Sequence, residues 1–327
     1  MVGRTKPGLL AFLAVALTAL APAARAGTPV TEAVRLDTPS GRIHGTLLLP
    51  SQPGPLPVAL IVSGSGPTDR DGNSTLLPGR NDSLKLLAEG LATRGIASLR
   101  YDKRGVGASA RAGPREFDLR FESYVEDAVR WLQRLRADPR FSTAVVVGHS
   151  EGSLVGMRAA ASGAAAGVVS IAGIARSPAQ VVRDQLRPQL PADLWQASER
   201  ILAKLEAGQT DDSVPEVLMA LYRPSVQPYL ISWFRHSPAR EAAQLRVPLL
   251  LVHGTADIQV GVQEAHALHA AQPQARLLVI EGMNHVLKAV PADPARQQAS
   301  YSDPGLPVMP ELVERIAGFV RWVAGRE

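Results

Sequence analysis

The chain has 327 residues, 46% of them hydrophobic, and contains no cysteine. This length suits one large α/β domain or two smaller ones with a sizeable core, and the absence of cysteine excludes disulfides, thiolate metal ligands and a cysteine nucleophile. The 35 basic and 30 acidic residues are scattered along the chain, which argues against a nucleic-acid-binding protein because such proteins carry a concentrated basic surface.

The first 26 residues have the features of an export signal. Arg4 and Lys6 precede an apolar run over residues 9–20, and residues 24–26 (Ala-Arg-Ala) have the small-x-small pattern that signal peptidase cuts. We expect export, to the periplasm or outside the cell, of a mature chain that begins near Gly27. The alternative is an uncleaved membrane anchor, but about a dozen apolar residues fall short of the roughly 20 that span a bilayer. No stable membrane insertion is therefore expected.

The mature chain is predicted to open with an antiparallel hairpin and to continue as alternating strands and helices. Turn-forming residues 38–41 separate two predicted strands at residues 31–37 and 43–49. The run at residues 58–62 is apolar throughout, which is typical of a strand in a sheet covered on both faces. The alternation predicts a mostly parallel, doubly wound α/β sheet. The next predicted strands cover residues 58–62, 96–101, 143–147 and 167–171, and the helices cover about 83–93, 121–136 and 151–161.

The alternation stops between residues 175 and 245. Prolines separate short helical patterns there, and no strand signal is strong. We predict an inserted helical lid at 175–245, within an α/β core formed by 27–174 and 246–327. The lid's aromatic residues are expected to line an apolar pocket: Trp195, Tyr222, Tyr229, Trp233 and Phe234. Beyond the lid, strands are predicted at 247–252 and 276–280, and helices at 262–271 and 311–323.

The sequence Gly148-His149-Ser150-Glu151-Gly152 follows a buried strand and opens a helix of small residues. A G-x-S-x-G sequence in that context places a serine on a strained strand-to-helix turn, with its hydroxyl exposed above the sheet. Ser150 is therefore the candidate nucleophile. The alternative is a glycine-bounded turn with a solvent-exposed serine.

A serine nucleophile needs a base and an acid that orients the base. Asp257 and His285 each follow a predicted strand by one loop, at the edge of the sheet where ligands bind. Asp257 could instead cap the helix that begins near residue 262, and Asp293 lies too far downstream to fit. His149 is expected to bond locally and His253 to lie behind the site. The other histidines are expected on the surface or lid: His44, His236, His266 and His269.

The order Ser150, Asp257, His285 is the order of the triad residues in the α/β-hydrolase superfamily. The chain resembles that superfamily over almost its whole mature length. The chain is most similar to its carboxylesterase and serine-aminopeptidase-like branch. The shared motifs are the Ser-Gly-Ser-Gly-Pro-x-Asp-Arg-Asp-Gly-Asn loop at 63–73, Asp-x-Arg-Gly-x-Gly-x-Ser at 102–109, and the motif around Ser150. The resemblance implies the α/β-hydrolase fold and a Ser-His-Asp triad.

Two backbone N–H groups are expected to stabilise the oxyanion. One belongs to Glu151, which follows the nucleophile and lies in the first turn of a helix. The resemblance places the other at Ser65, although Ser63 stands where many relatives have histidine. Which of Gly64, Ser65 and Gly66 points inward is left open.

The expected reaction is acyl transfer from a small-molecule carboxylic ester, with no metal or organic cofactor. An aminopeptidase, amidase or thioesterase is the first alternative. The Glu151 side chain could then bind a substrate amine, although a local hydrogen bond is the simpler role, and Arg104 is expected to pair with an acidic residue. A non-catalytic binding protein with this fold, and a membrane-tethered lipid hydrolase that keeps residues 1–26, are further alternatives.

Overall fold

The computed structural model describes residues 1–3, 27–113, 115–291 and 293–326. Nearly all of the predicted export signal therefore lies outside the described residues. Within the described ranges, no helix combines the length and the apolarity needed to cross a bilayer.

One eight-stranded sheet forms the centre of the molecule, in the order β1-β2-β4-β3-β5-β6-β7-β8. β1 and β2 form an antiparallel hairpin whose register runs from Val30–Leu49 to Thr38–Gly41, as predicted. β2 pairs antiparallel with β4, and all later pairs are parallel. The strands are β1 (Val30–Thr38), β2 (Gly41–Leu49), β3 (Leu56–Val62), β4 (Ala97–Tyr101), β5 (Phe141–His149), β6 (Gly167–Ile171), β7 (Leu249–Gly254) and β8 (Arg276–Ile280).

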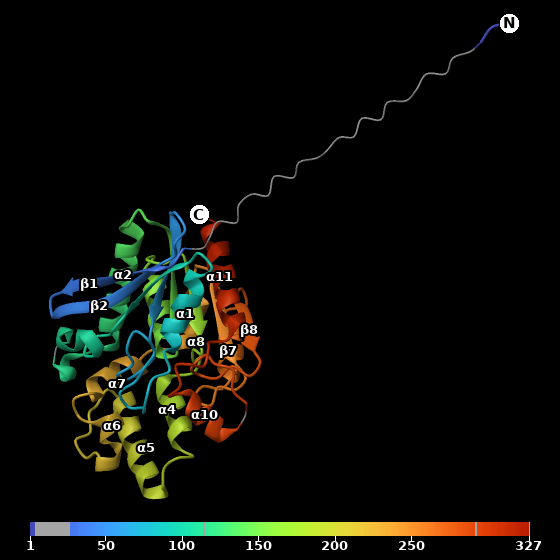
Figure 1. Ribbon diagram of the computed structural model, residues 1–327. Coiled ribbons are helices and arrows are strands. Elements are labelled where there is room, and N and C mark those ends of the chain that lie inside the picture. The colour runs from blue at the N-terminus through green and yellow to red at the C-terminus, as the bar shows by residue number, and fades with distance from the viewer. Residues whose placement is uncertain (4–26, 114, 292, 327) are drawn as a thin grey trace.

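Helices cover both faces of the sheet, which explains why β3 to β6 are buried along nearly their whole length (Figure 1). α1 (Ser83–Ala92) and α11 (Pro310–Ala324) contact each other on one face, while α2 (Phe121–Ala137) and α3 (Glu151–Ala161) cover the other. α2 is amphipathic, and burial of each large apolar side chain on its inner face stabilises the fold by roughly 1.5–3 kcal/mol. Those side chains include Phe121, Trp131, Leu132 and Leu135.

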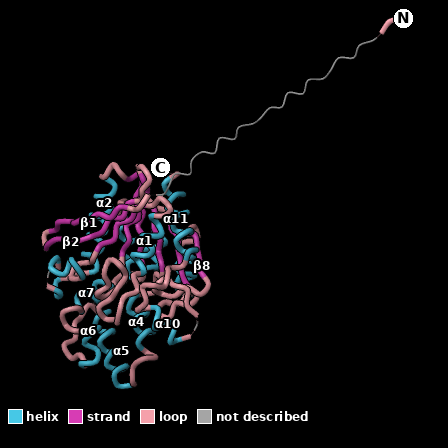
Figure 2. The backbone as a smooth tube through the Cα atoms, viewed as in Figure 1, coloured by secondary structure: helices cyan, strands magenta, loops and turns pink. Residues whose placement is uncertain are grey.

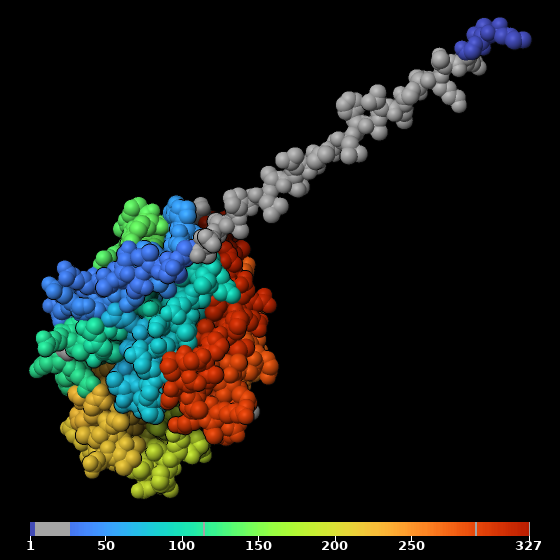
Figure 3. All heavy atoms as spheres, viewed as in Figure 1, coloured from blue at the N-terminus to red at the C-terminus, as the bar shows by residue number. Residues whose placement is uncertain are grey.

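Between β6 and β7, every regular element that the structure describes is a helix. Figure 1 and Figure 3 show α4 to α7 at one end of the molecule, and Figure 2 shows loops gathered between them and the strands. α7 packs on α2, and α8 packs on α3 and α9 (Gln263–Ala271). This segment comprises α4 (Pro178–Leu186), α5 (Ala192–Glu206), the 3-10 helix η3 (Glu216–Leu218), α6 (Met219–Tyr222), α7 (Gln227–Phe234) and α8 (Pro238–Gln244).

Three short elements were not predicted from the sequence. The region 102–118, expected to begin as a loop, contains the 3-10 helices η1 (Gly107–Ala112) and η2 (Glu116–Asp118). The chain after β8 contains α10 (Pro294–Ser300), whose first turn is capped by Asp293 accepting from the Arg296 N–H at 2.9 Å. Asp293 therefore has a structural role, consistent with its poor fit to a triad.

Candidate active site

Ser150 lies on a strained turn between β5 and α3. Its φ of 54° and ψ of −121° are unusual for a residue with a side chain, and its N–H donates to the Ile171 carbonyl at 2.8 Å. The flanking glycines are required by close contacts: a Cβ on Gly148 would lie 2.1 Å from the Gly152 carbonyl oxygen, and one on Gly152 would lie 2.3 Å from that of Val62. The G-x-S-x-G sequence thus forms the strand-to-helix turn that was predicted from it.

His285 and Asp257 form a buried hydrogen-bonded pair. His285 Nδ1 lies 2.7 Å from Asp257 Oδ2, and the two side chains are 6% and 1% exposed. Asp257 Oδ1 also accepts from the N–H groups of Gln259 and Val260, at 2.8 and 2.9 Å. Burial raises the pKa of Asp257, but the charge and hydrogen bond of His285 and the two N–H donors outweigh it, so the pKa is lowered overall. The carboxylate stays ionised and holds a proton on His285 Nδ1.

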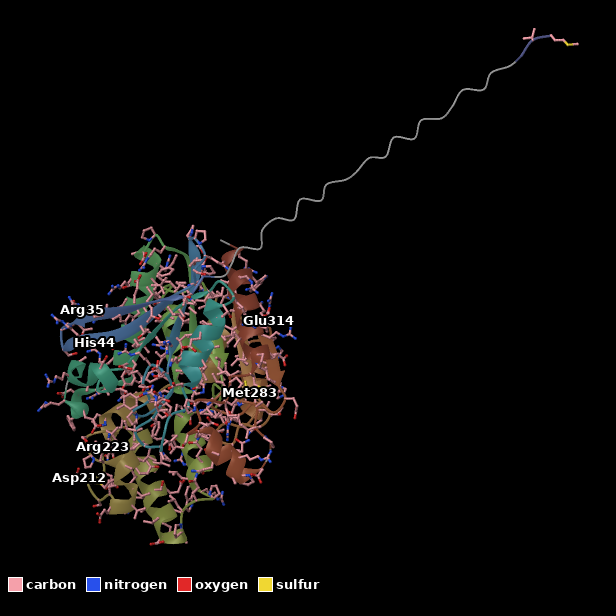
Figure 4. All side chains as sticks on the ribbon, viewed as in Figure 1. Arg35, His44, Asp212, Arg223, Met283 and Glu314 are labelled. Atoms are coloured by element: carbon pink, nitrogen blue, oxygen red, sulfur yellow. The ribbon has the colours of Figure 1, made fainter. Side chains whose placement is uncertain are left out.

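The loops that carry Asp257 and His285 are in direct contact. A Cβ on Gly254 would lie 1.9 Å from the carbonyl oxygen of Met283, which itself accepts from the Ala256 N–H at 3.1 Å. Met283 is labelled in Figure 4, where it lies on the loop after β8. Because the two loops follow adjacent strands, Asp257 and His285 are brought together by the fold itself.

Ser150 and His285 line the same cavity. Among the described side chains, no hydrogen bond joins Ser150 Oγ to His285. His149 supports the His285 backbone, since its Nε2 donates to the His285 carbonyl at 2.8 Å. Burial and the charge of His285 lower the pKa of His149 to about 3, so His149 is neutral and holds the His285 backbone, in agreement with the local role predicted for it.

The predicted oxyanion residues lie on both sides of Ser150. Glu151 is the first residue of α3, so its N–H is one of the helix donors without an intrahelical acceptor. On the other side, Gly64 and Ser65 line the cavity, and a Cβ on Gly64 would lie 3.2 Å from Ser150 Cβ. Gly66 has a φ of 67° and is exposed.

The cavity at Ser150 has a volume of about 680 Å³, which suits a small organic ligand. From the chain between β6 and β7, only α4, its flanks and the loop after it contribute, from Arg176 to Gln189. The five aromatic residues expected to line the pocket are absent from its described lining. That prediction was wrong because α7 turns Tyr229 and Phe234 into the core against α2. Apolar lining comes instead from Leu76, Leu77, Val181, Leu186, Ile258, Val260 and Val286.

Two side chains near the site have well-defined partners elsewhere. Arg104 makes a buried two-bonded ion pair with Asp127, with both N–O distances at 2.6 Å, so the acidic partner predicted for it exists. The Glu151 side chain is also buried and accepts from the Tyr229 hydroxyl at 2.5 Å. This is the local hydrogen bond that was expected, although Tyr229 comes from a segment that no sequence motif connects with Glu151.

The remaining histidines are absent from the described lining of the cavity. His253 is buried, and its Nε2 donates to the Val260 carbonyl at 2.8 Å, while Nδ1 has no partner among the described groups. His236, in the turn between α7 and α8, lies 3.1 Å from Glu122. His44 is labelled in Figure 4 on the β1–β2 hairpin. In the described ranges, no three His, Asp or Glu side chains are grouped to hold a metal ion.

Several known proteins are similar to this chain in sequence or in structure. The family described as serine aminopeptidase, S33, matches residues 75–214, a segment that contains Ser150 but ends before Asp257 and His285. Solved structures share the architecture: Est1E from Butyrivibrio proteoclasticus with ferulic acid bound has a TM-score of 0.60 at 17% identity, over 88% of this chain and 99% of that one. The chain has the α/β-hydrolase fold.

Further known proteins are similar to the chain over different shares of their length. Esterase EstD of Thermotoga maritima is 30% identical over 248 residues, which cover 75% of this chain and 58% of that esterase. The chain thus spans less than two thirds of that relative. A puromycin-hydrolyzing peptidase of Mycobacterium tuberculosis has a TM-score of 0.55 at 20% identity, covering 91% of this chain and 40% of the peptidase. Esterases and a peptidase therefore share the fold.

Proposed function

We propose that the chain is a serine hydrolase that cleaves small carboxylic esters through an acyl-enzyme. The observation that carries the proposal is the ionised, buried Asp257 bonded to His285 beside a serine on a strained turn. That pairing supplies what a serine hydroxyl lacks at neutral pH, namely a base held in a fixed orientation by an acid.

In the first half-reaction, Ser150 Oγ bonds to the ester carbonyl carbon and its proton passes to His285 Nε2. The resulting oxyanion lies between the N–H of Glu151 and the loop that carries Ser65. The carbon–oxygen bond to the alcohol then breaks, and His285 gives its proton to that oxygen. In the second half-reaction, water gives a proton to His285 while its oxygen bonds to the acyl carbon. The bond from that carbon to Ser150 Oγ then breaks, the acid leaves, and His285 returns the proton to Oγ.

The Glu151 side chain favours an ester over an aminoacyl substrate. An aminopeptidase needs a free acid to bind the substrate amine, but the Glu151 carboxylate is 2% exposed and bonded to Tyr229. Glu264, also at the cavity, bonds to the backbone of Ala175 and Arg176 and to the Arg176 guanidinium. Both carboxylates are therefore already paired, while the apolar lining suits acyl and alkyl groups.

Turnover of p-nitrophenyl butyrate, its thioester analogue and aminoacyl-p-nitroanilides tests the reaction class. We expect hydrolysis of the oxyester, with the amides at least about 100-fold slower in kcat/KM, and loss of oxyester activity in Ser150→Ala. Turnover of the anilides alone would make the protein a peptidase, and an active Ser150→Ala would remove the serine mechanism.

We also propose that the protein is exported and cleaved after Ala26, on the strength of the basic, apolar and small-residue segments of residues 1–26. N-terminal sequencing of the exported protein is expected to begin at Gly27. A retained Met1 on a membrane-bound chain would favour the tethered alternative.

A further inference from the structure

Lys103 is a fully buried lysine directly behind the loop that carries Ser65. Its side chain is 1% exposed and is not part of the cavity lining. The ammonium group has two polar partners: Nζ donates to the carbonyl oxygen of Gly64, and it lies 3.4 Å from Glu151 Oε2. A buried ammonium is costly unless it is paired, so this lysine needs an explanation.

The bond to Gly64 fixes the direction of the next N–H group. In a trans peptide the C=O of one residue and the N–H of the next point in opposite directions. Lys103 holds the Gly64 carbonyl on the buried side, so the Ser65 N–H faces the other way. Gly64 and Ser65 both line the cavity, and Gly64 lies against Ser150. The Ser65 N–H has no acceptor among the described residues.

A buried network keeps the Lys103 ammonium in place. Burial lowers the pKa of Lys103, and the carboxylate of Glu151 opposes that shift. Glu151 is in turn held by the Tyr229 hydroxyl, and Nζ lies 5.1 Å from the centre of the Tyr124 ring, close enough for a cation–π contact. These four residues come from the loop after β4 and from α3, α7 and α2 respectively.

We propose that Lys103 is a positioning residue that fixes the Gly64–Ser65 peptide, so that the Ser65 N–H and the Glu151 N–H form the oxyanion hole. This inference rests on the proposed serine hydrolase function. Lys103 touches no substrate and acts through the Gly64 carbonyl. It also selects Ser65 over Gly64 and Gly66 as the residue that donates.

The test compares substitutions in two buried ion pairs whose basic residues, Lys103 and Arg104, are consecutive on one loop. Lys103→Met removes the donor to Gly64 but leaves the buried Glu151 carboxylate without a positively charged partner. Lys103→Met/Glu151→Gln is therefore made alongside it. Replacing both members of a buried ion pair is often neutral for stability. Arg104→Met/Asp127→Asn is the matched control, because it removes the neighbouring buried pair without touching Gly64. Thermal unfolding establishes that each variant is folded.

The readouts are kcat and KM for p-nitrophenyl butyrate and the Ki of a trifluoromethyl ketone, whose adduct with serine carries an oxyanion. We expect the Lys103→Met/Glu151→Gln variant to lose about 100-fold in kcat, the typical effect of losing one oxyanion donor. Its KM should stay within about three-fold of wild type and its Ki should rise by about the same factor as kcat falls. The control variant should keep kcat within about three-fold of wild type.

Three results would overturn the inference while leaving the hydrolase intact. They are a folded Lys103→Met/Glu151→Gln variant with kcat close to wild type, a kcat loss without any change in Ki, and an equal loss in the Arg104→Met/Asp127→Asn control. A folded wild-type protein that neither hydrolyses the ester nor binds the ketone would instead overturn the proposed function, and this inference with it.

Discussion

The two walls of the cavity are built in opposite ways. The wall that carries Ser150, Asp257 and His285 is held by backbone contacts and buried hydrogen bonds, and the acid and base side chains are at most 6% exposed. Other lining residues form an exposed wall, where Leu76 and Ile258 are each 68% exposed, although they are large and apolar. Under the proposed function, the first wall holds the reacting groups in place, whereas the second offers apolar surface that a ligand could cover. Substitutions in the first should therefore change kcat, and substitutions in the second should change KM.

The largest effect is expected at Asp257. Asp257→Asn keeps the size of the side chain but can present its amide N–H to His285 and favour the wrong tautomer, so kcat should fall by about 10⁴-fold with little change in KM. Steady-state kinetics on p-nitrophenyl butyrate measures this. Asp293→Asn is the matched control, because that carboxylate caps α10 and should affect only stability. Equal kcat in Asp257→Asn and wild type would remove the distinction between the two walls.

Gly148→Ala tests whether the turn at Ser150 tolerates a side chain at position 148. The added methyl group would meet the Gly152 carbonyl oxygen at 2.1 Å, so we expect a loss of about 3 kcal/mol in the free energy of unfolding, or failure to fold. Gly318→Ala is the control, because a Cβ there meets nothing within 4 Å inside α11 and should stabilise the helix by about 0.5–1 kcal/mol. Urea unfolding of both variants measures the difference. An unchanged midpoint for Gly148→Ala would show that the turn is not tightly constrained.

The buried wall should also be sensitive to acid. The pKa of His149 is about 3 in the folded protein and 6.5 when unperturbed, so below pH 6.5 the unfolded chain binds more protons. Stability should therefore fall as the pH drops from 6.5 toward 3, by up to about 1.4 kcal/mol per pH unit from this residue alone.

His149→Gln isolates that contribution, because glutamine can donate to the His285 carbonyl without titrating. Urea unfolding at pH 7 and pH 5 should show a smaller loss of stability in His149→Gln than in wild type. His253, whose pKa is also lowered by burial, leaves a residual dependence in both. Identical pH dependence in the two proteins would mean that His149 is not held neutral.

The smallest effect is expected on the exposed wall. Leu76→Ala/Leu77→Ala removes apolar surface at the cavity, so KM for p-nitrophenyl octanoate should rise by about ten-fold, while kcat changes little. The acetate ester, which reaches less of this surface, should be affected least. Val217→Ala is the matched control, since Val217 is 71% exposed and lies outside the cavity lining. A loss in kcat equal to the rise in KM would show that this wall takes part in the chemistry.

The buried wall around Ser150 was also more predictable from the sequence than the exposed wall. Ser150, Asp257 and His285 each follow an apolar strand, and parallel strands bring their following loops to one edge, so local patterns place these residues together. The structure confirms the sheet, the hairpin and the pairing of His285 with Asp257. The catalytic role of these residues stays a prediction.

Contacts between distant segments could not be predicted. Lys103 lies 39 residues from Gly64 and 48 from Glu151, and no local periodicity records such pairs. The aromatic residues of 175–245 predict burial, but their sequence does not say whether they face the cavity or α2. Short helices such as α10 gain their stability from tertiary packing and a cap rather than from a long periodic pattern, so they leave little signal.

The most direct test of the proposed chemistry is covalent labelling with a fluorophosphonate, followed by mass spectrometry of the peptide that contains Ser150. The reagent reacts with a serine only where a base and an oxyanion site activate it. We expect one label per folded molecule, located on Ser150, and none in Ser150→Ala. A folded wild-type protein that stays unlabelled, or carries its label on another residue, would contradict the assignment of Ser150 as the nucleophile.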